Sequence, residues 1–219
     1  MARQTLSAAK DPSRSPPVQR RSRERYERIL GCAMAIMAEK GADALRMSDL
    51  VERTGIPFGS LYQYFPDKTA VVAALAHRYN AIGRGCVARD LSALRTAGDL
   101  YGVLCALTDS YYAFFVREPV VLHVWQATQA DRTLQAIDEA DGIYLIGLLI
   151  AALETAFPQS PPQARVSFAQ VVMVLIAAAV RHAVTLPSED AAPVLATFKR
   201  LLPRDMPLDA DHAPTLKPL

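Results

Sequence analysis

The chain has 219 residues, with 24 lysines and arginines, 22 aspartates and glutamates, and a formal net charge of +2. Its hydrophobic content of 51% and charged content of 21% exclude disorder throughout the chain and allow one large domain or two small ones. The three cysteines are an odd number and lie far apart, which excludes a disulfide-stapled secreted fold and favours a cytoplasmic protein.

The composition favours helices over strands. The chain contains 36 alanines against 10 glycines, and alanine is the best helix former whereas glycine is a poor one. No segment shows strand-like alternation of useful length, so we predict an all-α protein. The first 21 residues have no apolar core, so we expect no signal peptide, and the longest apolar runs, 143–153 and 171–180, are too short to span a bilayer.

Positive charge is concentrated at the start of the chain. Residues 1–28 carry eight basic and three acidic side chains, and residues 1–68 carry 12 basic and eight acidic ones. Residues 1–20 are also rich in proline and show no apolar periodicity, so we expect them to form a disordered basic arm. A basic front end on a nearly neutral body indicates an anionic partner for the N-terminal part.

The first predicted helix covers about 22–40, with Ser22 as its N-cap and Gly41 as the residue after its end. Helical spacing places its apolar side chains on one face. These side chains are Tyr26, Ile29, Leu30, Ala33, Ile36 and Met37.

Three further helices follow at short intervals. The second covers about 47–54 and ends at Gly55. Pro57 suits the first turn of the third helix, which has to end before Pro66. Asp67 is a good N-cap for the fourth helix.

The remaining chain predicts five more helices separated by proline or polar breaks. We expect them near 99–117, 119–128, 131–156, 162–185 and 189–202. The pattern therefore predicts a small domain over 21–68, a larger helical domain over 69–203, and a flexible tail over 204–219.

The two short helices at Ser48–Lys68 and the tight turn between them form a helix-turn-helix pattern. Leu50, Val51, Ile56, Leu61 and Phe65 can form its internal face. If these residues face inward, the outward-facing residues are Phe58, Ser60, Gln63 and Tyr64. In such a motif the second helix lies in the major groove of DNA and its side chains meet the base edges.

The residues Ile29–Gly41, Asp49–Gly55 and GSLYQYFPDK resemble the N-terminal domain of the TetR family of bacterial transcriptional regulators. The match covers roughly Ser22–Ile82. The resemblance implies a homodimer that binds a pseudo-palindromic DNA operator, acts most often as a repressor, and releases the operator when a small-molecule inducer binds.

The resemblance also implies which residues contact DNA. The arginines of the basic N-terminal end, Arg20, Arg21, Arg23 and Arg25, are candidates as a group. The individual matching positions are Arg23, Arg46, Ser48, Phe58, Ser60, Tyr62, Tyr64 and Lys68. Two of them depart from the family pattern. Arg46 stands where a capping Thr or Ser is common and cannot accept the capping hydrogen bond, whereas Phe58 stands where a polar residue is common and can pack on a thymine methyl group.

Residues beyond about 83 match no motif, but their helical pattern agrees with the ligand-binding and dimerisation domain of the family. The helices near 162–185 and 189–202 would then form a four-helix interface between two subunits. We expect Tyr112, Phe115, His123 and Trp125 to line a ligand pocket, although ordinary core packing is the better explanation of each aromatic residue taken separately.

Other functions find less support in the sequence. Cys86, Cys105, His77 and His123 have no metal-site spacing, so we expect no metal site and no cofactor. The chain has no nucleophile elbow, phosphate loop or HExxH motif. The cluster of Asp138, Glu139 and Asp141 is better explained as a solvated helix face. We therefore expect no enzyme and no catalytic residue. A ligand-independent DNA-binding protein or an activator of the same fold stays open, as do the identities of the inducer and the operator.

Overall fold

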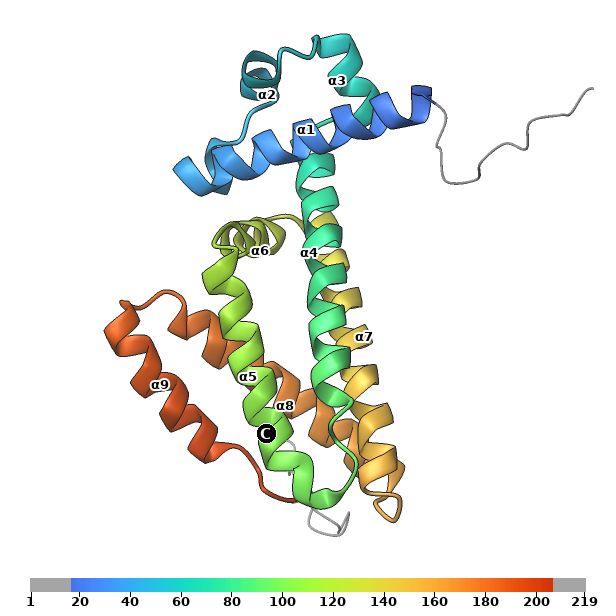
Figure 1. Ribbon diagram of the computed structural model, residues 1–219, viewed down its shortest axis with the longest axis vertical. Coiled ribbons are helices and arrows are strands. Elements are labelled where there is room, and N and C mark those ends of the chain that lie inside the picture. Colours follow the sequence, from blue (N-terminus) through green and yellow to red (C-terminus); the bar gives the residue numbers. More distant parts are fainter. Residues whose placement is uncertain (1–16, 207–219) are drawn as a thin grey trace, which may run out of the picture.

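A computed structural model describes residues 17–206 of the chain (Figure 1). Within this range it contains nine α-helices, two short 3₁₀ turns and no strand, which confirms the all-α prediction. The helices form a small head at one end and a longer helical body, and α4 (Lys68–Leu91) runs from the head into the body.

The head consists of α1 (Pro17–Lys40), α2 (Met47–Thr54), α3 (Phe58–Tyr64) and the first turns of α4. Figure 1 shows α2 and α3 on the side of α1 that faces away from the body. Two glycines permit the turns between these helices, because Gly41 (φ 82°) and Gly55 (φ 66°) lie in the left-handed region that side chains rarely adopt.

The predicted N-cap of α4 is confirmed, whereas that of α1 is wrong. The Asp67 carboxylate accepts a hydrogen bond of 2.7 Å from the backbone N–H of Ala70. Helix α1 begins at Pro17, so Ser22 lies inside it and caps nothing. Proline is well tolerated in a first helical turn and no helix breaker follows it, so residues 17–20 of the expected arm are helical. The rest of that arm lies outside the described residues.

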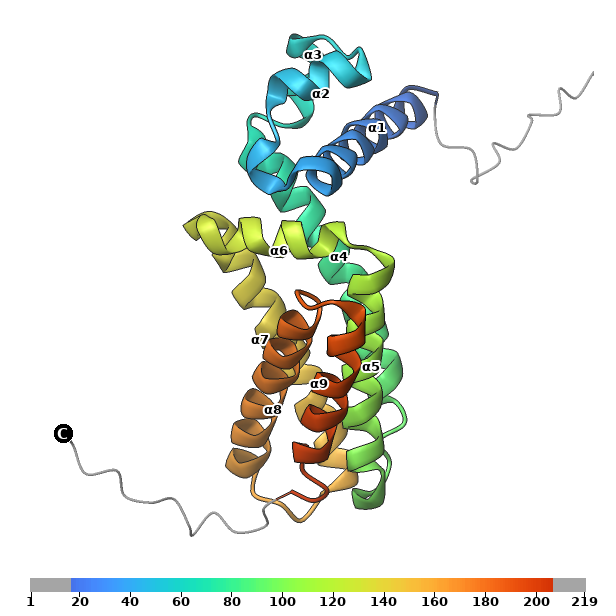
Figure 2. The same ribbon diagram turned by 90° about the vertical axis from the view of Figure 1, so that its left-hand side faces the viewer.

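The body is built from five helices in addition to α4: α5 (Leu100–Arg117), α6 (Val120–Ala130), α7 (Arg132–Ala156), α8 (Pro162–Ala183) and α9 (Ser188–Leu201). Helices α4, α5, α7, α8 and α9 run along the body, and α6 crosses its upper end beneath α1 (Figure 2). The start of the expected tail is packed, because Met206 is buried and the Arg204 guanidinium lies 4.1 Å from the centre of the Tyr101 ring. Residues 207–219 lie outside the described range.

Helix α8 carries more apolar surface than the body covers. By length and composition alone it is the one helix of residues 17–206 that could cross a membrane, yet most of its apolar stretch is not buried. The exposed side chains Val171, Val174 and Leu175 lie on one face at spacings of three and four residues. A helix that is apolar on most sides requires cover on most sides, so this face lacks a partner in the single chain.

Candidate nucleic-acid interface and interior cavity

Helix α3 presents two aromatic side chains to solvent at the end of the molecule farthest from the body. Phe58 and Tyr62 are 47% and 48% exposed, and their rings stack with centroids 6.0 Å apart and planes at 19°. Four residues separate them, so they lie one above the other on the same face of the helix. Large exposed aromatic side chains on a short helix are an unusual surface and suit contact with flat or apolar groups.

The opposite face of α3 holds the head together. Leu50, Ile56, Leu61 and Phe65 are all buried, and the Phe65 ring stacks on Tyr26 of α1 with centroids 5.2 Å apart. The predicted internal face is therefore confirmed for these residues. Its fifth member, Val51, is only half-buried.

Tyr64 and Ser60, which the sequence placed on the outward face, are half-buried. The Tyr64 hydroxyl lies 3.1 Å from the hydroxyl of Ser22 on α1, in the wall of a shallow depression that Arg23 also lines. This hydrogen bond joins the end of α3 to α1. Ser22 was expected as a cap, and only the three-dimensional fold brings it to Tyr64.

The positive side chains of the head differ in whether a carboxylate forms an ion pair with them. Arg53 bonds Glu39 at 2.8 Å and Arg78 bonds Glu27 at 2.7 Å, so these two arginines fasten α2 and α4 to α1. Arg23 and Arg46 are exposed, and no carboxylate of the described residues lies within 4.0 Å of either. Among the described residues, the half-buried Lys68 makes only a long contact, 3.4 Å from its Nζ to the backbone oxygen of Asp43.

Helix α2 begins without a capping side chain. Arg46 occupies the N-cap position in an extended conformation and no side chain bonds the first N–H groups of the helix. The exposed Ser48 hydroxyl points at Asp49 instead, at 3.4 Å. The free N–H groups at this helix start form a weakly positive site that favours an anion.

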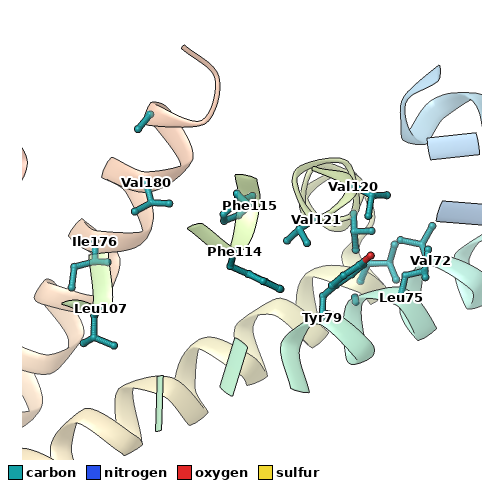
Figure 3. Close-up of a cluster of buried hydrophobic side chains, with 14 of the residues drawn as sticks. Val72, Leu75, Tyr79, Leu107, Phe114, Phe115, Val120, Val121, Ile176 and Val180 are labelled. Carbon is teal, nitrogen blue, oxygen red and sulfur yellow. The ribbon is translucent and has the colours of Figure 1, made fainter. Parts of the chain in front are cut away.

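A cavity of about 270 Å³ lies inside the body between α4, α5, α6, α7 and α8. Its wall is mainly apolar, and aromatic side chains from three helices contribute to it: Tyr79, Tyr111, Phe114, Phe115 and Trp125. Figure 3 shows how the apolar side chains of α4, α5, α6 and α8 converge in this part of the body. The volume is close to the lower end of the range for small-molecule sites, roughly 300–1,000 Å³.

The structure brings together two of the four residues predicted to line a pocket. Phe115 and Trp125 lie in the cavity wall, whereas Tyr112 and His123 do not. The reason is helical phase, since Tyr111 shares the lining face with Phe115 four residues later, while Tyr112 points about 100° away from Tyr111. The rings of Tyr111 and Phe115 pack edge to face at 5.0 Å, and this spacing of four is the signal that would have found Tyr111.

Charged groups cluster around Tyr111 at one part of the cavity wall. Burial raises the pKa of the Tyr111 hydroxyl, and the nearby Arg181 guanidinium partly opposes this shift. Burial also raises the pKa of the Asp141 carboxyl, against the hydrogen bond of 2.5 Å that Arg84 donates to it. Asp141 is buried rather than part of a solvated face, so that expectation is wrong for this residue.

Tyr79 connects the cavity with the head. Its ring lies in the cavity wall and packs edge to face on Phe114 at 6.1 Å (Figure 3). Its hydroxyl donates a hydrogen bond of 3.0 Å to the sulfur of Met34 on α1. Burial, and secondarily the charge of Glu118, raise the pKa of Tyr79 to about 12. A molecule in the cavity would therefore touch a side chain that is bonded to the first helix of the head.

Two family models match the chain. The model described as "Tetracyclin repressor-like, C-terminal domain" matches residues 98–208, and the model described as "Bacterial regulatory proteins, tetR family" matches residues 29–75. The first match covers half of the chain, and the second covers α2, α3 and parts of α1 and α4.

Curated relatives share the head. The chain is 40% identical over 52 residues to the HTH-type transcriptional regulator YvdT of Bacillus subtilis, which is 24% of this chain and 27% of that protein. It is 39% identical over 61 residues to the HTH-type transcriptional repressor KstR of Mycobacterium tuberculosis, which is 27% of this chain and 28% of that protein. The chain thus spans less than a third of the length of these relatives.

Solved structures share the whole fold at low sequence identity. A TetR-family transcriptional regulator from Agrobacterium tumefaciens has a TM-score of 0.63 and 20% identity, over 85% of this chain and all of the other. The transcriptional regulator FadR of Bacillus subtilis, solved in complex with stearoyl-CoA, has a TM-score of 0.62 and 16% identity, over 80% of this chain and 96% of the other.

Proposed function

This chain belongs to the TetR family of bacterial regulatory proteins, and we propose that it is a transcriptional repressor that binds operator DNA as a homodimer and releases it when a small molecule fills the body. In this proposal residues 21–68 form the DNA-binding domain and residues 69–203 form the ligand-binding and dimerisation domain. The observation that carries the proposal is the exposed aromatic pair on α3.

The head has the charge and shape that DNA requires. Phe58 and Tyr62 stand out from a short helix that can enter a major groove, where an aromatic ring can pack on a thymine methyl group. Around them we assign phosphate and base contacts to the other predicted residues: Arg23, Arg46, Ser48, Ser60, Tyr64 and Lys68. Because Ser60 and Tyr64 are half-buried, they would contact DNA at the edge of the surface, and Phe58 and Tyr62 at its centre.

Dimerisation is supported by the uncovered face of α8. Val171, Val174 and Leu175 form an apolar stripe on α8, and Leu201 is exposed on the neighbouring α9. A two-fold axis through such a face buries the same patch on both subunits and produces a four-helix interface. The same axis would place two α3 helices for two DNA half-sites roughly 34–36 Å apart.

Ligand response is supported by the cavity and by Tyr79. A ligand that displaces the Tyr79 ring would disturb the hydrogen bond to Met34, and this would change how α1 packs on the body. If one head position suits the operator and another suits the filled cavity, the two binding events oppose each other.

The proposal is tested by mixing the purified chain with a random pool of DNA duplexes and sequencing the bound fraction over several rounds. We expect enrichment of an inverted repeat whose half-sites are about one helical turn apart. The Phe58→Ala, Tyr62→Ala double variant provides the matched control, because both side chains are exposed and their loss leaves the internal face of α3 intact. Retention of DNA without sequence enrichment, equal for both proteins, would contradict the proposal.

A further inference from the structure

Helix α3 carries no charged side chain. Its residues, Phe58–Tyr64, include neither a basic nor an acidic one. The exposed cations of the head come from other helices, with Arg23 on α1 and Arg46 at the start of α2. An arginine or lysine that bonds guanine is the commonest base-specific contact in protein–DNA complexes, and α3 has no such residue. Any base contacts of α3 are therefore made by neutral side chains.

Phe58 faces outward in the first turn of α3. Its side chain is 47% exposed, and the stack with Tyr62, at 6.0 Å between ring centroids, favours one orientation of the ring. A turn of about 100° per residue places Gln63 roughly 140° and Ser60 roughly 160° away from Phe58 around the helix axis. A base edge that meets Phe58 thus meets an apolar ring, and no amide or charged group of α3 lies beside it.

The residue next to Phe58 leaves room for a close approach. Gly59 is exposed, and a Cβ atom at this position would have no neighbour within 4 Å. The packing of the head therefore does not require glycine here, although glycine inside a helix is destabilising relative to alanine. Glycine at such a position allows a surface from outside the chain to come close to the helix backbone. A close approach of DNA at Gly59 would bring the neighbouring Phe58 ring to the base edges.

The major groove offers an aromatic ring one apolar feature, the 5-methyl group of thymine. Adenine, guanine and cytosine present hydrogen-bonding groups there and no methyl group. A phenyl ring has no donor or acceptor for these groups, and covering them without a partner is unfavourable. Phe58 therefore favours a thymine over the other three bases.

We propose that Phe58 is a specificity-determining residue, which reads the 5-methyl group of a pyrimidine in each operator half-site. This inference rests on the proposed DNA binding and adds the chemical feature that the regulator recognises. The ring contacts the methyl group and makes no hydrogen bond to the base. For this reason 5-methylcytosine, which carries the same group at the same ring position, is bound in place of thymine, and methylation of a cytosine at this position strengthens binding.

The test uses the inverted repeat enriched by the DNA selection. Each thymine of one half-site is exchanged in turn for deoxyuridine, which pairs like thymine and lacks only the methyl group. In gel-shift titrations at fixed salt, we expect at least one position at which the exchange weakens binding about fourfold, the effect of uncovering one methyl group. Phe58→Ala should bind the thymine and deoxyuridine duplexes equally at that position. Arg46→Ala is the matched control, because loss of a phosphate contact weakens binding to both duplexes alike and leaves the fourfold difference in place.

A second pair of duplexes separates the methyl group from the rest of the base. With a C·G pair at the sensitive position, we expect the parent chain to bind 5-methylcytosine about fourfold more tightly than cytosine, and Phe58→Ala to bind the two equally. Equal binding of the two duplexes by the parent chain would contradict the proposal.

The proposal is also overturned if no thymine of the half-site is sensitive to the exchange, or if Phe58→Ala retains every sensitivity. These failures differ from failure of the proposed function. In the latter case no inverted repeat is enriched, whereas an enriched repeat that is insensitive to its methyl groups removes only the role assigned to Phe58.

Discussion

Tyr64 has two roles that substitutions can separate, because its ring belongs to α3 and its hydroxyl bonds Ser22 on α1. Tyr64→Ala should weaken operator binding by about 1–3 kcal/mol, through loss of a DNA contact and of the support of α3. Tyr64→Phe keeps the ring and loses only the hydroxyl, so we expect about 0.5–1.5 kcal/mol less unfolding free energy and nearly unchanged operator affinity. Gel-shift titration and urea unfolding measure the two effects. An equal loss of affinity in both variants would make the hydroxyl a DNA contact and contradict this division.

Lys68 has an ammonium group that the fold leaves almost unused, since its only described contact is 3.4 Å long. If it binds a DNA phosphate, Lys68→Ala should reduce the slope of log affinity against log salt by about one unit. Operator titrations at several salt concentrations measure this slope. Arg95→Ala is the control, because Arg95 is exposed between α4 and α5 at the end of the body away from the head. A slope that is equal in the two variants would remove Lys68 from the interface.

Tyr79 makes the folding stability of the protein depend on pH in the alkaline range. Its pKa is raised to about 12, chiefly by burial, above an ordinary value of 10.0. The folded state therefore holds this proton more tightly than the unfolded state does. The stability that this difference contributes is complete below about pH 10 and is lost as the pH rises through 12. Tyrosinate absorbance should show late titration of the buried Tyr79 and Tyr111, and Tyr79→Phe should lose one of these two late-titrating groups. Complete ionisation of all tyrosines near pH 10 would contradict the burial argument.

Which residues meet in the cavity depended on information that the sequence does not contain. Phe115 and Trp125 were predicted, but Tyr112 and His123 lie about one helical position off the lining face. Apolar residues occur on nearly every side of these body helices, so periodicity does not distinguish the cavity wall from the rest of the core.

At the scale of elements, the residues that begin or end helices decided how well the helix boundaries could be predicted. The ends of α2, α3 and α5–α9 were predicted to within a few residues, because glycine, proline or a capping aspartate stands at or near most of these boundaries. The start of α1 was placed five residues too late, since a serine inside a helix and a serine at its cap look the same in the sequence. The head was also easier to predict than the body, because its short helices carry a motif and the body helices carry none.

The exposed face of α8 predicts the oligomeric state. Leu175 is 49% exposed in the single chain and does not line the cavity, so Leu175→Asp should act on the interface alone. A charge buried at the centre of an apolar interface costs several kcal/mol, and we expect this variant to be monomeric at micromolar concentration where the parent chain is a dimer. Sedimentation velocity distinguishes the two. Val116→Asp is the matched control, because Val116 is also exposed but lies on α5. A monomeric parent chain would remove the proposed interface.

At the scale of the whole molecule, the head is fastened to the body at defined points rather than tethered to it. Arg78 on α4 bonds Glu27 on α1, Tyr79 bonds Met34, and α6 lies beneath α1. Helix α4 is continuous from the head to the far end of the body. We therefore expect movement within the body to reach α1, and in the proposed dimer the distance between the two heads would be set by how the two bodies pack together.

These contacts predict how the proposed dimer would tolerate changes in its operator. Insertion of five base pairs between the half-sites turns them to opposite faces of the duplex, where two fastened heads cannot reach both. We therefore expect affinity to fall to that of a single half-site, whereas five base pairs inserted outside the repeat should change nothing. Gel-shift titration at fixed salt measures both duplexes. The Leu175→Asp monomer should bind the original and the lengthened repeat equally, which shows that the sensitivity comes from the linked heads. A parent dimer that binds both repeats with the same affinity would mean that its heads move independently, against the contacts that fasten α1 to α4.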